Sequence, residues 1–185
     1  MAARAAVAPE QRHAEARALC ARVPNLFEGG TEAVAAYVPV ASEPGSLELL
    51  NVLLDVCHRV LLPIARMSTD RTPLPLRWAE YRRDELVSAP FGLLEPPDPW
   101  LPPSALFEAG LVLVPALAVD RHGVRLGRGT GFYDRSLSFA NPSAHLIAVV
   151  RDDELVDDLP AEPHDVPVTH ALTPGLGLVA LSQSD

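Results

Sequence analysis

Hydrophobic positions along the chain follow two periods, one typical of helices and one typical of strands. Apolar residues at helical spacing predict two helices, one over residues 9–22 and one from Ser46 to about His58. Pro9 fits the first turn of the former helix, and Ser46 can cap the latter. Apolar runs predict strands at residues 35–40, 59–65, 111–119 and 145–150.

Two further segments complete this pattern. Residues 76–83 alternate between apolar and polar, which predicts a half-exposed strand, and residues 132–140 are expected to form a helix. The runs at 111–119 and 145–150 are apolar enough to be covered on both faces. Strands separated by helices favour a mostly parallel sheet in a three-layer α/β fold, with helices on both faces.

Proline marks the one long interruption in this pattern. Of the 185 residues 19 are proline, and many fall within residues 90–103, which predicts an extended connector. Neither flank of the connector is long enough to be a comfortable domain. We therefore interpret residues 1–185 as a single domain with one long excursion.

Composition and charge exclude several classes of protein. A chain with 48% hydrophobic residues can bury a core, which excludes global disorder. The formal net charge of −9 disfavours nucleic-acid binding, which needs clustered positive charge. The 15 basic residues are all arginine, so chemistry that needs a lysine, such as Schiff-base formation or the P-loop, is excluded.

The cysteines and the apolar runs indicate the cellular compartment of the protein. Cys20 and Cys57 are isolated in the sequence, which predicts reduced, buried thiols rather than a disulfide or a zinc site. The first residues lack the apolar segment of a secretory signal, and no run reaches the length of a membrane span. We expect a cytoplasmic monomer that binds neither membranes nor nucleic acid.

The segment from Arg125 to Asp134 holds the densest candidate chemistry. Glycines at alternate positions allow positive φ and a close approach of the backbone to a ligand, at Gly127, Gly129 and Gly131. Successive N–H groups before a helix, together with two arginines, favour an anion such as phosphate. The alternative is a glycine loop that only reverses the direction of the chain and binds no ligand. The glycine spacing differs from the dinucleotide-binding motif GxGxxG, which disfavours an NAD site.

Two carboxylates are candidates for a metal site. Asp134 could stabilise the start of the expected helix or hold Mg²⁺ beside phosphates, and the sequence leaves both open. Asp165, taken alone, is better explained as a loop carboxylate beside a solvated His164.

At this point the residues carry a resemblance. The stretch RLGRGTGFYDRSL, preceded by LVLVPALAVDRHG, resembles the strongest motif of the 5-formyltetrahydrofolate cyclo-ligase family. Weaker matches follow in the family's order: YVPVASEPGSLELL at 37–50, VLLPIAR at 60–66, FGLLEP at 91–96, and LPAEPHDVPV at 159–168 followed by Thr173. The resemblance covers residues 37–174 and implies a Rossmann-like fold, similar to sugar-phosphate isomerase and CoA-transferase domains, although no loop supports those chemistries.

The resemblance implies an ATP- and Mg²⁺-dependent ligase that closes 5-formyltetrahydrofolate to 5,10-methenyltetrahydrofolate and releases ADP and phosphate. Its catalytic residues would be Arg125 and Tyr133. ATP-binding positions match Arg125, Gly127, Arg128, Gly129, Thr130, Gly131, Phe132 and Tyr133. Folate-binding positions match Val38, Glu43, Arg128, Gly129, Thr130, Gly131 and Phe132. Metal-binding positions match Asp134 and Asp165.

Two points stay open beside this resemblance. Glu43 alone could equally be a glutamate in the first turn of a helix. The family opens with a helix whose Lys and Arg contact ATP, and both positions align before Met1, so residues 1–25 are interpreted as a shortened form of that helix. An upstream start, a shortened chain and a loss of these contacts remain possible explanations. The alternative function is a non-catalytic relative that binds nucleotide or reduced folate.

Overall fold

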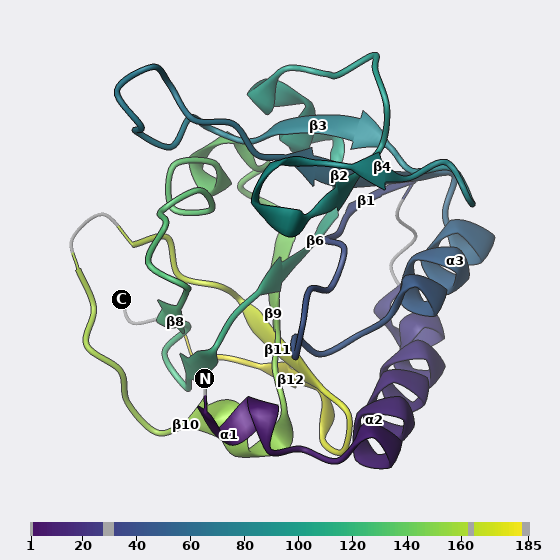
Figure 1. Cartoon of the computed structure of the whole chain (residues 1–185). Helices are drawn as coiled ribbons and strands as arrows, with labels where there is room; N and C mark the ends of the chain where they lie inside the picture. Colours follow the sequence, from purple (N-terminus) through teal and green to yellow (C-terminus); the bar gives the residue numbers. More distant parts are fainter. Residues whose placement is uncertain (1, 28–31, 163–164, 183–185) are drawn as a thin grey trace.

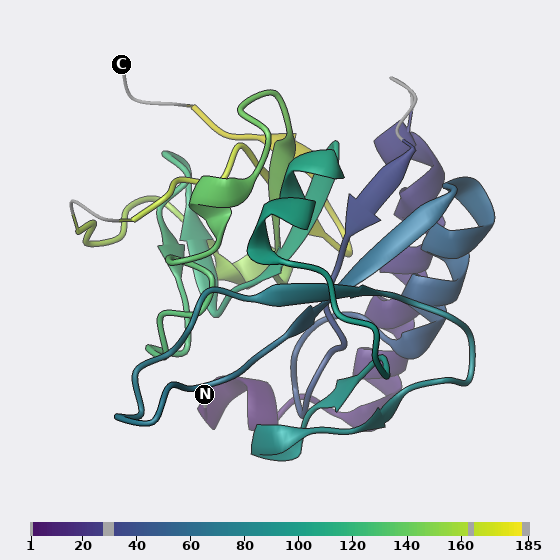
Figure 2. The same cartoon turned by 90° about the horizontal axis from the view of Figure 1, so that it is seen from above.

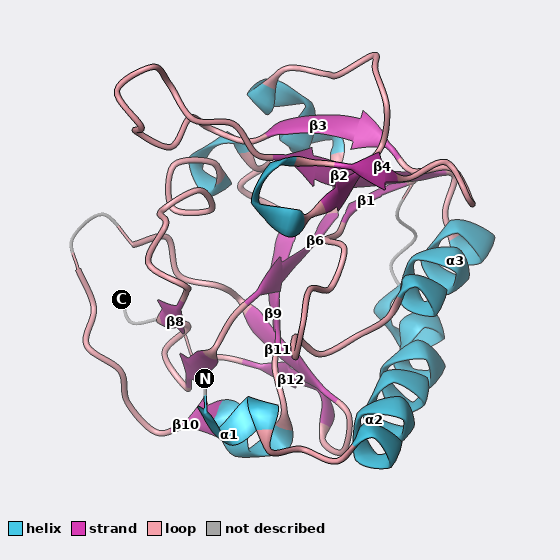
Figure 3. Cartoon of the chain, in the orientation of Figure 1, coloured by secondary structure: helices cyan, strands magenta, loops and turns pink. Residues whose placement is uncertain are grey.

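A seven-stranded sheet forms the centre of the computed structural model, which describes residues 2–27, 32–162 and 165–182 (Figures 1 and 3). Its strands are β1 (Ala33–Ala35), β2 (Arg59–Ile64), β3 (Arg77–Glu80), β6 (Leu111–Pro115), β9 (His145–Val149), β11 (His170–Thr173) and β12 (Gly177–Ala180). The order across the sheet is β12-β11-β9-β6-β1-β2-β3. The five inner strands run parallel, and the edge strands β3 and β12 pair antiparallel.

Alternate residues of the inner strands enter two hydrophobic clusters, one on each face of the sheet. In β6, Leu111 and Leu113 belong to one cluster, whereas Val112 and Val114 belong to the other. This is the packing that the continuous apolar run predicts, because a strand covered on both faces has no polar side to alternate with.

Helices cover the face of the sheet to which Leu111 and Leu113 point. Helix α2 (Pro9–Arg22) and helix α3 (Leu47–Val56) lie side by side there, as both views show (Figures 1 and 2). They contribute Leu19, Leu49, Leu50 and Leu53, all at most 2% exposed, to the cluster on that side. In α3, Leu49 and Leu50 lie four and three residues before Leu53, so these three leucines form one apolar stripe toward the sheet.

Short 3₁₀ helices form the third layer on the opposite face. These are η3 (Pro103–Glu108) and η4 (Leu137–Phe139), and their Leu106 and Leu137 enter the second cluster. The expected three-layer α/β fold is therefore confirmed. The expectation of a single domain over 1–185 stays a prediction.

The N-terminal elements agree with the sequence in outline. Helix α2 has the predicted bounds, and α3 begins after Ser46, although the Ser46 side chain makes no capping hydrogen bond within the described chain. A short helix α1 (Ala2–Ala5) precedes α2, and a 3₁₀ helix η1 (Val23–Phe27) follows it. Both cysteines are free, and Cys57 is buried as expected of both, whereas Cys20 is only partly buried.

The predicted helix over 132–140 is wrong. Residues 132–136 form turns, and only η4 is helical. Ser136 explains this difference, because its hydroxyl donates to the Phe132 carbonyl at 2.6 Å and accepts the Leu76 N–H at 2.8 Å. A serine that binds nearby backbone in this way competes with helical hydrogen bonds.

Three predicted strands have different bounds. The run 111–119 breaks after Pro115, and its second half becomes β7 (Ala118–Asp120) in a separate small sheet with β8 (Arg125–Leu126) and β10 (Leu155–Val156). The run 35–40 leaves the sheet after β1. The run 76–83 is shortened to β3, where neighbours Trp78 and Ala79 are both buried instead of alternating.

The proline connector contains more structure than predicted. A two-stranded ladder of β4 (Val87–Ser88) and β5 (Leu94–Glu95) flanks a 3₁₀ turn, η2 (Pro90–Gly92). We call residues 87–95 the flap. No helix in the described part of the chain is long and apolar enough to cross a membrane.

Candidate active site

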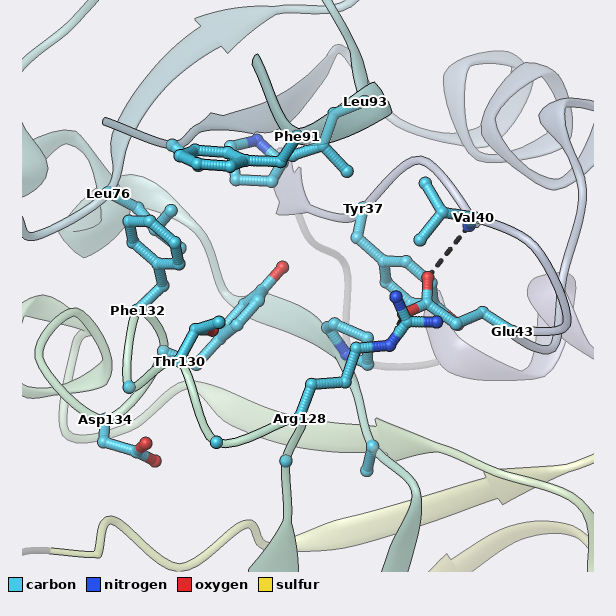
Figure 4. Close-up of a pocket in the computed structure, with 18 of the residues that line it drawn as sticks. Tyr37, Val40, Glu43, Leu76, Phe91, Leu93, Arg128, Thr130, Phe132 and Asp134 are labelled. Atoms are coloured by element: carbon cyan, nitrogen blue, oxygen red, sulfur yellow. Dashed lines mark hydrogen bonds and ion pairs between the residues drawn. The ribbon is translucent and has the colours of Figure 1, made fainter. Parts of the chain in front are cut away.

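A pocket of about 270 Å³ opens at the carboxyl ends of β1, β2 and β6, three neighbouring parallel strands (Figure 4). The chain segments that follow these strands line it with Tyr37, Val38, Ala65, Met67, Ala116 and Leu117. Open parallel sheets bind ligands at this edge, since the loops after the strands leave a crevice there.

The glycine loop, residues 125–134, lines another side of the pocket. Gly129 and Gly131 have φ of 80° and 73°, as predicted for a backbone that only glycine adopts easily. Gly127 has a different reason, because a Cβ there would lie 2.9 Å from Nη1 of Arg125. The helix expected to follow this loop is absent, so anion binding here rests on backbone N–H groups and arginines.

Arg125 is buried within this loop. Its side chain is 5% exposed, forms an ion pair with Asp134, and places its guanidinium carbon 5.8 Å from the ring centre of Tyr133. Its Nε is buried without a hydrogen-bond partner among the described residues. A buried cation beside one partly exposed carboxylate suits an anionic ligand, which would compensate more of its charge.

Glu43 lies beside Arg128 of the glycine loop, and the two side chains form a polar part of the pocket wall (Figure 4). One carboxylate oxygen of Glu43 accepts the Val40 N–H at 2.9 Å, and the other lies 3.3 Å from Nε of Arg128. The Glu43 side chain is 8% exposed, and burial raises its pKa above the ordinary value, although the Val40 N–H and the Arg128 charge lower it in part. Glu43 precedes helix α3, so the alternative of a first-turn glutamate is excluded.

Two tyrosines lie close to this carboxylate. The Tyr37 hydroxyl donates to the Pro44 carbonyl at 2.7 Å. Burial, followed by the charge of Glu43, raises the pKa of both Tyr37 and Tyr133. Both phenols are therefore neutral at pH 7 and able to donate hydrogen bonds.

The flap closes the remaining side with apolar residues. Phe91, Leu93 and Leu94 line the pocket, and the Phe91 ring lies 6.1 Å from the Phe132 ring at 55° (Figure 4). The pocket therefore has an apolar wall facing a pair of opposite charges.

The structure brings almost all predicted site residues to this one pocket: Val38, Glu43, Arg125, Gly127, Arg128, Gly129, Thr130, Gly131, Phe132, Tyr133 and Asp134. Asp165 is the exception, because it does not line the pocket and its carboxylate accepts the Glu162 N–H at 2.8 Å. His164 lies outside the described residues.

Sequence reasoning missed much of the lining: Tyr37, Val40, Pro63, Ala65, Met67, Leu76, Phe91, Leu93, Leu94, Pro115, Ala116 and Leu117. The motif FGLLEP was a usable signal for the flap residues. The others are ordinary apolar positions whose sequence carries no mark of a site.

Comparison with known proteins agrees with this geometry. The model of the 5-formyltetrahydrofolate cyclo-ligase family matches residues 1–174. The chain belongs to this family. A 5-formyltetrahydrofolate cyclo-ligase of Mycolicibacterium smegmatis is 59% identical over 170 residues, which cover 92% of this chain and 87% of that protein. The Escherichia coli K12 cyclo-ligase is 28% identical over 175 residues, covering 92% and 94%. The chain is accordingly an enzyme of the cyclo-ligase family.

Solved structures show the same fold. The 5,10-methenyltetrahydrofolate synthetase of Aquifex aeolicus superposes with a TM-score of 0.74 at 23% identity, covering 98% of this chain and 89% of that one. The Mycoplasma pneumoniae synthetase gives 0.66 at 17% identity, covering 89% and 88%.

The carboxylates at the pocket decide whether it fits the expected Mg²⁺. Among the described residues no three His, Cys, Asp or Glu side chains form a cluster that could hold a metal ion. Mg²⁺ next to a nucleotide needs fewer protein ligands, because it keeps waters and binds substrate phosphates with one or two carboxylates. Asp134, with a side chain 27% exposed at the pocket, fits this role; Asp165 does not line the pocket, and its part in holding the ion stays a prediction.

Proposed function

We propose that the chain catalyses the ATP- and Mg²⁺-dependent cyclisation of 5-formyltetrahydrofolate to 5,10-methenyltetrahydrofolate, with release of ADP and phosphate. One observation supports it above the others. A single pocket holds both a buried carboxylate, Glu43, and an arginine- and glycine-rich loop beside it. The names of the relatives are consistent with this reaction.

Glu43 is the proposed anchor for the folate ring. The pterin carries ring N–H and amino donors, and a carboxylate offers two oxygens to them. The oxygen now bound to Val40 N–H fixes the direction of the carboxylate, while the other oxygen faces Arg128. Val38 and the apolar flap exclude water from the ring, which strengthens these polar contacts.

The glycine loop is the proposed site of the ATP phosphates. Arg125 and Arg128 supply planar guanidinium groups, and the backbone at Gly129 is open, since a Cβ placed there would meet no heavy atom within 4 Å. Phosphoryl transfer needs mainly positioning and charge neutralisation, so a buried arginine at this point acts directly on the reacting group.

The proposed reaction has two stages. The formyl oxygen first attacks the γ-phosphorus of ATP, the bond between that phosphorus and ADP breaks, and ADP leaves; N10 then attacks the formyl carbon. The carbon–oxygen bond breaks, phosphate carries the oxygen away, and N10 loses its proton. Arg125 is proposed to neutralise the transferring group, and the neutral Tyr133 hydroxyl to donate a hydrogen bond beside it.

Asp134 is the residue that would hold Mg²⁺. The ion, when bound, neutralises the phosphate oxygens and orients them for transfer. Before it binds, Asp134 is paired with Arg125, so the same carboxylate also fixes the guanidinium. The proposal includes that the protein acts on reduced folate and ATP in the cytoplasm and that it does so as a monomer.

The test is formation of methenyl-folate absorbance by the purified chain with 5-formyltetrahydrofolate, ATP and Mg²⁺. Arg125→Ala and Asp134→Ala should each abolish ATP-dependent formation. Asp157→Ala, which removes an exposed carboxylate that pairs with Arg121 outside the pocket, is the matched control and should retain activity. Unchanged rates in both Arg125→Ala and Asp134→Ala would reject the site.

A further inference from the structure

The flap is a separate unit of secondary structure. Within the described chain its strands pair with each other alone, Val87 with Glu95 and Ser88 with Leu94, and not with the seven-stranded sheet. A two-stranded ladder of this length is not stable alone, so contacts outside the ladder must fix its position.

The tip of the flap faces the pocket. Phe91 is 59% exposed, has a φ of 64°, and its ring lies against that of Phe132. Leu93 and Leu94 line the pocket beside it. Phe91 is therefore placed over the pocket without being buried, while Leu93 packs against the core cluster on that side of the sheet, so the flap is held by this contact together with its base.

Arg66 and Glu95 fix that base. The two groups form a two-point ion pair, in which Nη1 of Arg66 lies 2.8 Å from Oε2 of Glu95 and Nη2 donates to Oε1. Nη1 also donates to the Ala65 carbonyl at 2.8 Å, and Ala65 lines the pocket. The Glu95 side chain is 6% exposed, so the pair joins the last residue of the flap to the segment leaving β2 in a site sheltered from water.

Trp100 holds the guanidinium from the other side. Its ring centre lies 4.3 Å from Cζ of Arg66, which is stacking distance for a cation on an indole. Arg77 in β3 donates to the Trp100 carbonyl at 2.9 Å, and Leu101 exchanges backbone hydrogen bonds with Trp78. Arg66 therefore lies between the flap and a segment anchored to the edge of the main sheet.

We propose that Arg66 and Glu95 are positioning residues that hold the flap over the pocket and thereby set the affinity for the organic substrate. The proposal rests on the proposed function in taking the substrate under the flap to be the reduced folate. Neither side chain lines the pocket, so they act through Phe91, Leu93 and Leu94. This assigns a role to the glutamate of FGLLEP, which the reaction itself does not use.

The first arm of the test needs no ligand. Hydrogen exchange of the free protein is compared for the native chain, Glu95→Gln and Arg66→Lys. The Ala89 amide, bonded to the Leu93 carbonyl at 3.0 Å, should exchange faster in both variants, while amides of β6 stay unchanged. Glu80→Gln, which removes another carboxylate paired with an arginine, is the matched control and should leave the flap unchanged.

The second arm measures the KM for 5-formyltetrahydrofolate and kcat. Glu95→Gln should raise KM by at least about tenfold with little change in kcat, since a displaced binding wall weakens binding more than chemistry. In a Phe91→Ala background the same change should have much less effect, because both act through the flap. Arg66→Lys keeps the charge and serves if Glu95→Gln does not fold.

Three results would overturn the proposal: unchanged flap exchange in both variants, a looser flap with unchanged KM, or additive effects of Phe91→Ala and Glu95→Gln. A native chain that forms no methenyl-folate would instead reject the proposed function, and the exchange arm would still decide whether the pair holds the flap.

Discussion

Glu43 and Arg128 meet at one side of the pocket although they are far apart in the sequence, and Nε of the arginine lies 3.3 Å from the glutamate carboxylate. The arginine belongs to the proposed phosphate loop, and the glutamate to the proposed folate wall. The Arg128 side chain is 38% exposed, so it can turn from Glu43 toward a phosphate when substrates bind. The pair links the two halves of the proposed reaction.

Glu43→Gln should weaken binding of the folate without weakening binding of ATP. The amide keeps the size of the side chain but loses the charge, which weakens hydrogen bonds from the pterin by about 1.5–3 kcal/mol. The KM for 5-formyltetrahydrofolate should therefore rise about tenfold to a hundredfold, whereas the KM for ATP should change little. Steady-state kinetics with each substrate varied in turn measures both values, and an equal rise in both would contradict the assignment.

The pH dependence of folate binding follows from the same residue. Burial raises the pKa of Glu43, and its ionised form is the one that accepts both pterin hydrogen bonds. Affinity should therefore be full above the raised pKa and should fall as pH drops through it, at a higher pH than an ordinary glutamate would give. Titration of the dissociation constant against pH should show this fall in the native chain and not in Glu43→Gln. A fall in both proteins would assign it to another group.

Two neighbouring glycines should respond differently to alanine. Gly127→Ala introduces no positive φ but places a methyl group 2.9 Å from the Arg125 guanidinium, so ATP-dependent turnover should fall while stability changes little. Gly129→Ala meets nothing within 4 Å but has a φ of 80°, so it should cost about 1–2 kcal/mol of unfolding free energy. Urea unfolding and turnover measured together distinguish them, and the reverse pattern would contradict this account.

A stacked histidine pair should make the fold sensitive to acid. The rings of His145 and His170 lie 4.7 Å apart, and burial, followed by the charge of His145, lowers the pKa of His170 below 6.5. A lowered histidine pKa means that the unfolded chain binds the proton more tightly. Its contribution to stability is therefore full above about pH 6.5 and is lost as pH falls toward the lower folded pKa.

His170→Gln tests this relationship. The slope of unfolding free energy against pH, measured with urea from about pH 8 to about pH 5, should be smaller in the variant than in the native chain. An identical slope would show that His170 does not take up a proton on unfolding in this pH range.

The sequence predicted the parts of the fold and site that are local in the chain. The apolar period of α2 and the apolar run of β6 depend on residues that are neighbours in the sequence. The same holds for the glycine loop, whose positive φ angles require glycine at positions 129 and 131. The roles expected of Glu43 and Asp134 came from the family resemblance rather than from spacing alone, and they remain predictions.

The remaining features depend on contacts between distant segments. Ser136 prevents the expected helix partly by bonding to Leu76, 60 residues earlier, which no local pattern reveals. The sequence does not mark Tyr37 as a pocket residue, because Tyr37 lines the pocket only as a result of the path that the chain takes after β1. The role of Glu95 depends on Arg66, which lies 29 residues away and is brought near only by the path of the flap.

The central claim is that one pocket couples consumption of ATP to closure of the folate ring. Its most direct test is the ratio of ADP to methenyl-folate formed by the native chain in the same reaction. The account predicts one ADP for each methenyl-folate, with neither product formed when the other substrate is omitted. Methenyl-folate formed without ADP, or ADP formed without reduced folate, would contradict it.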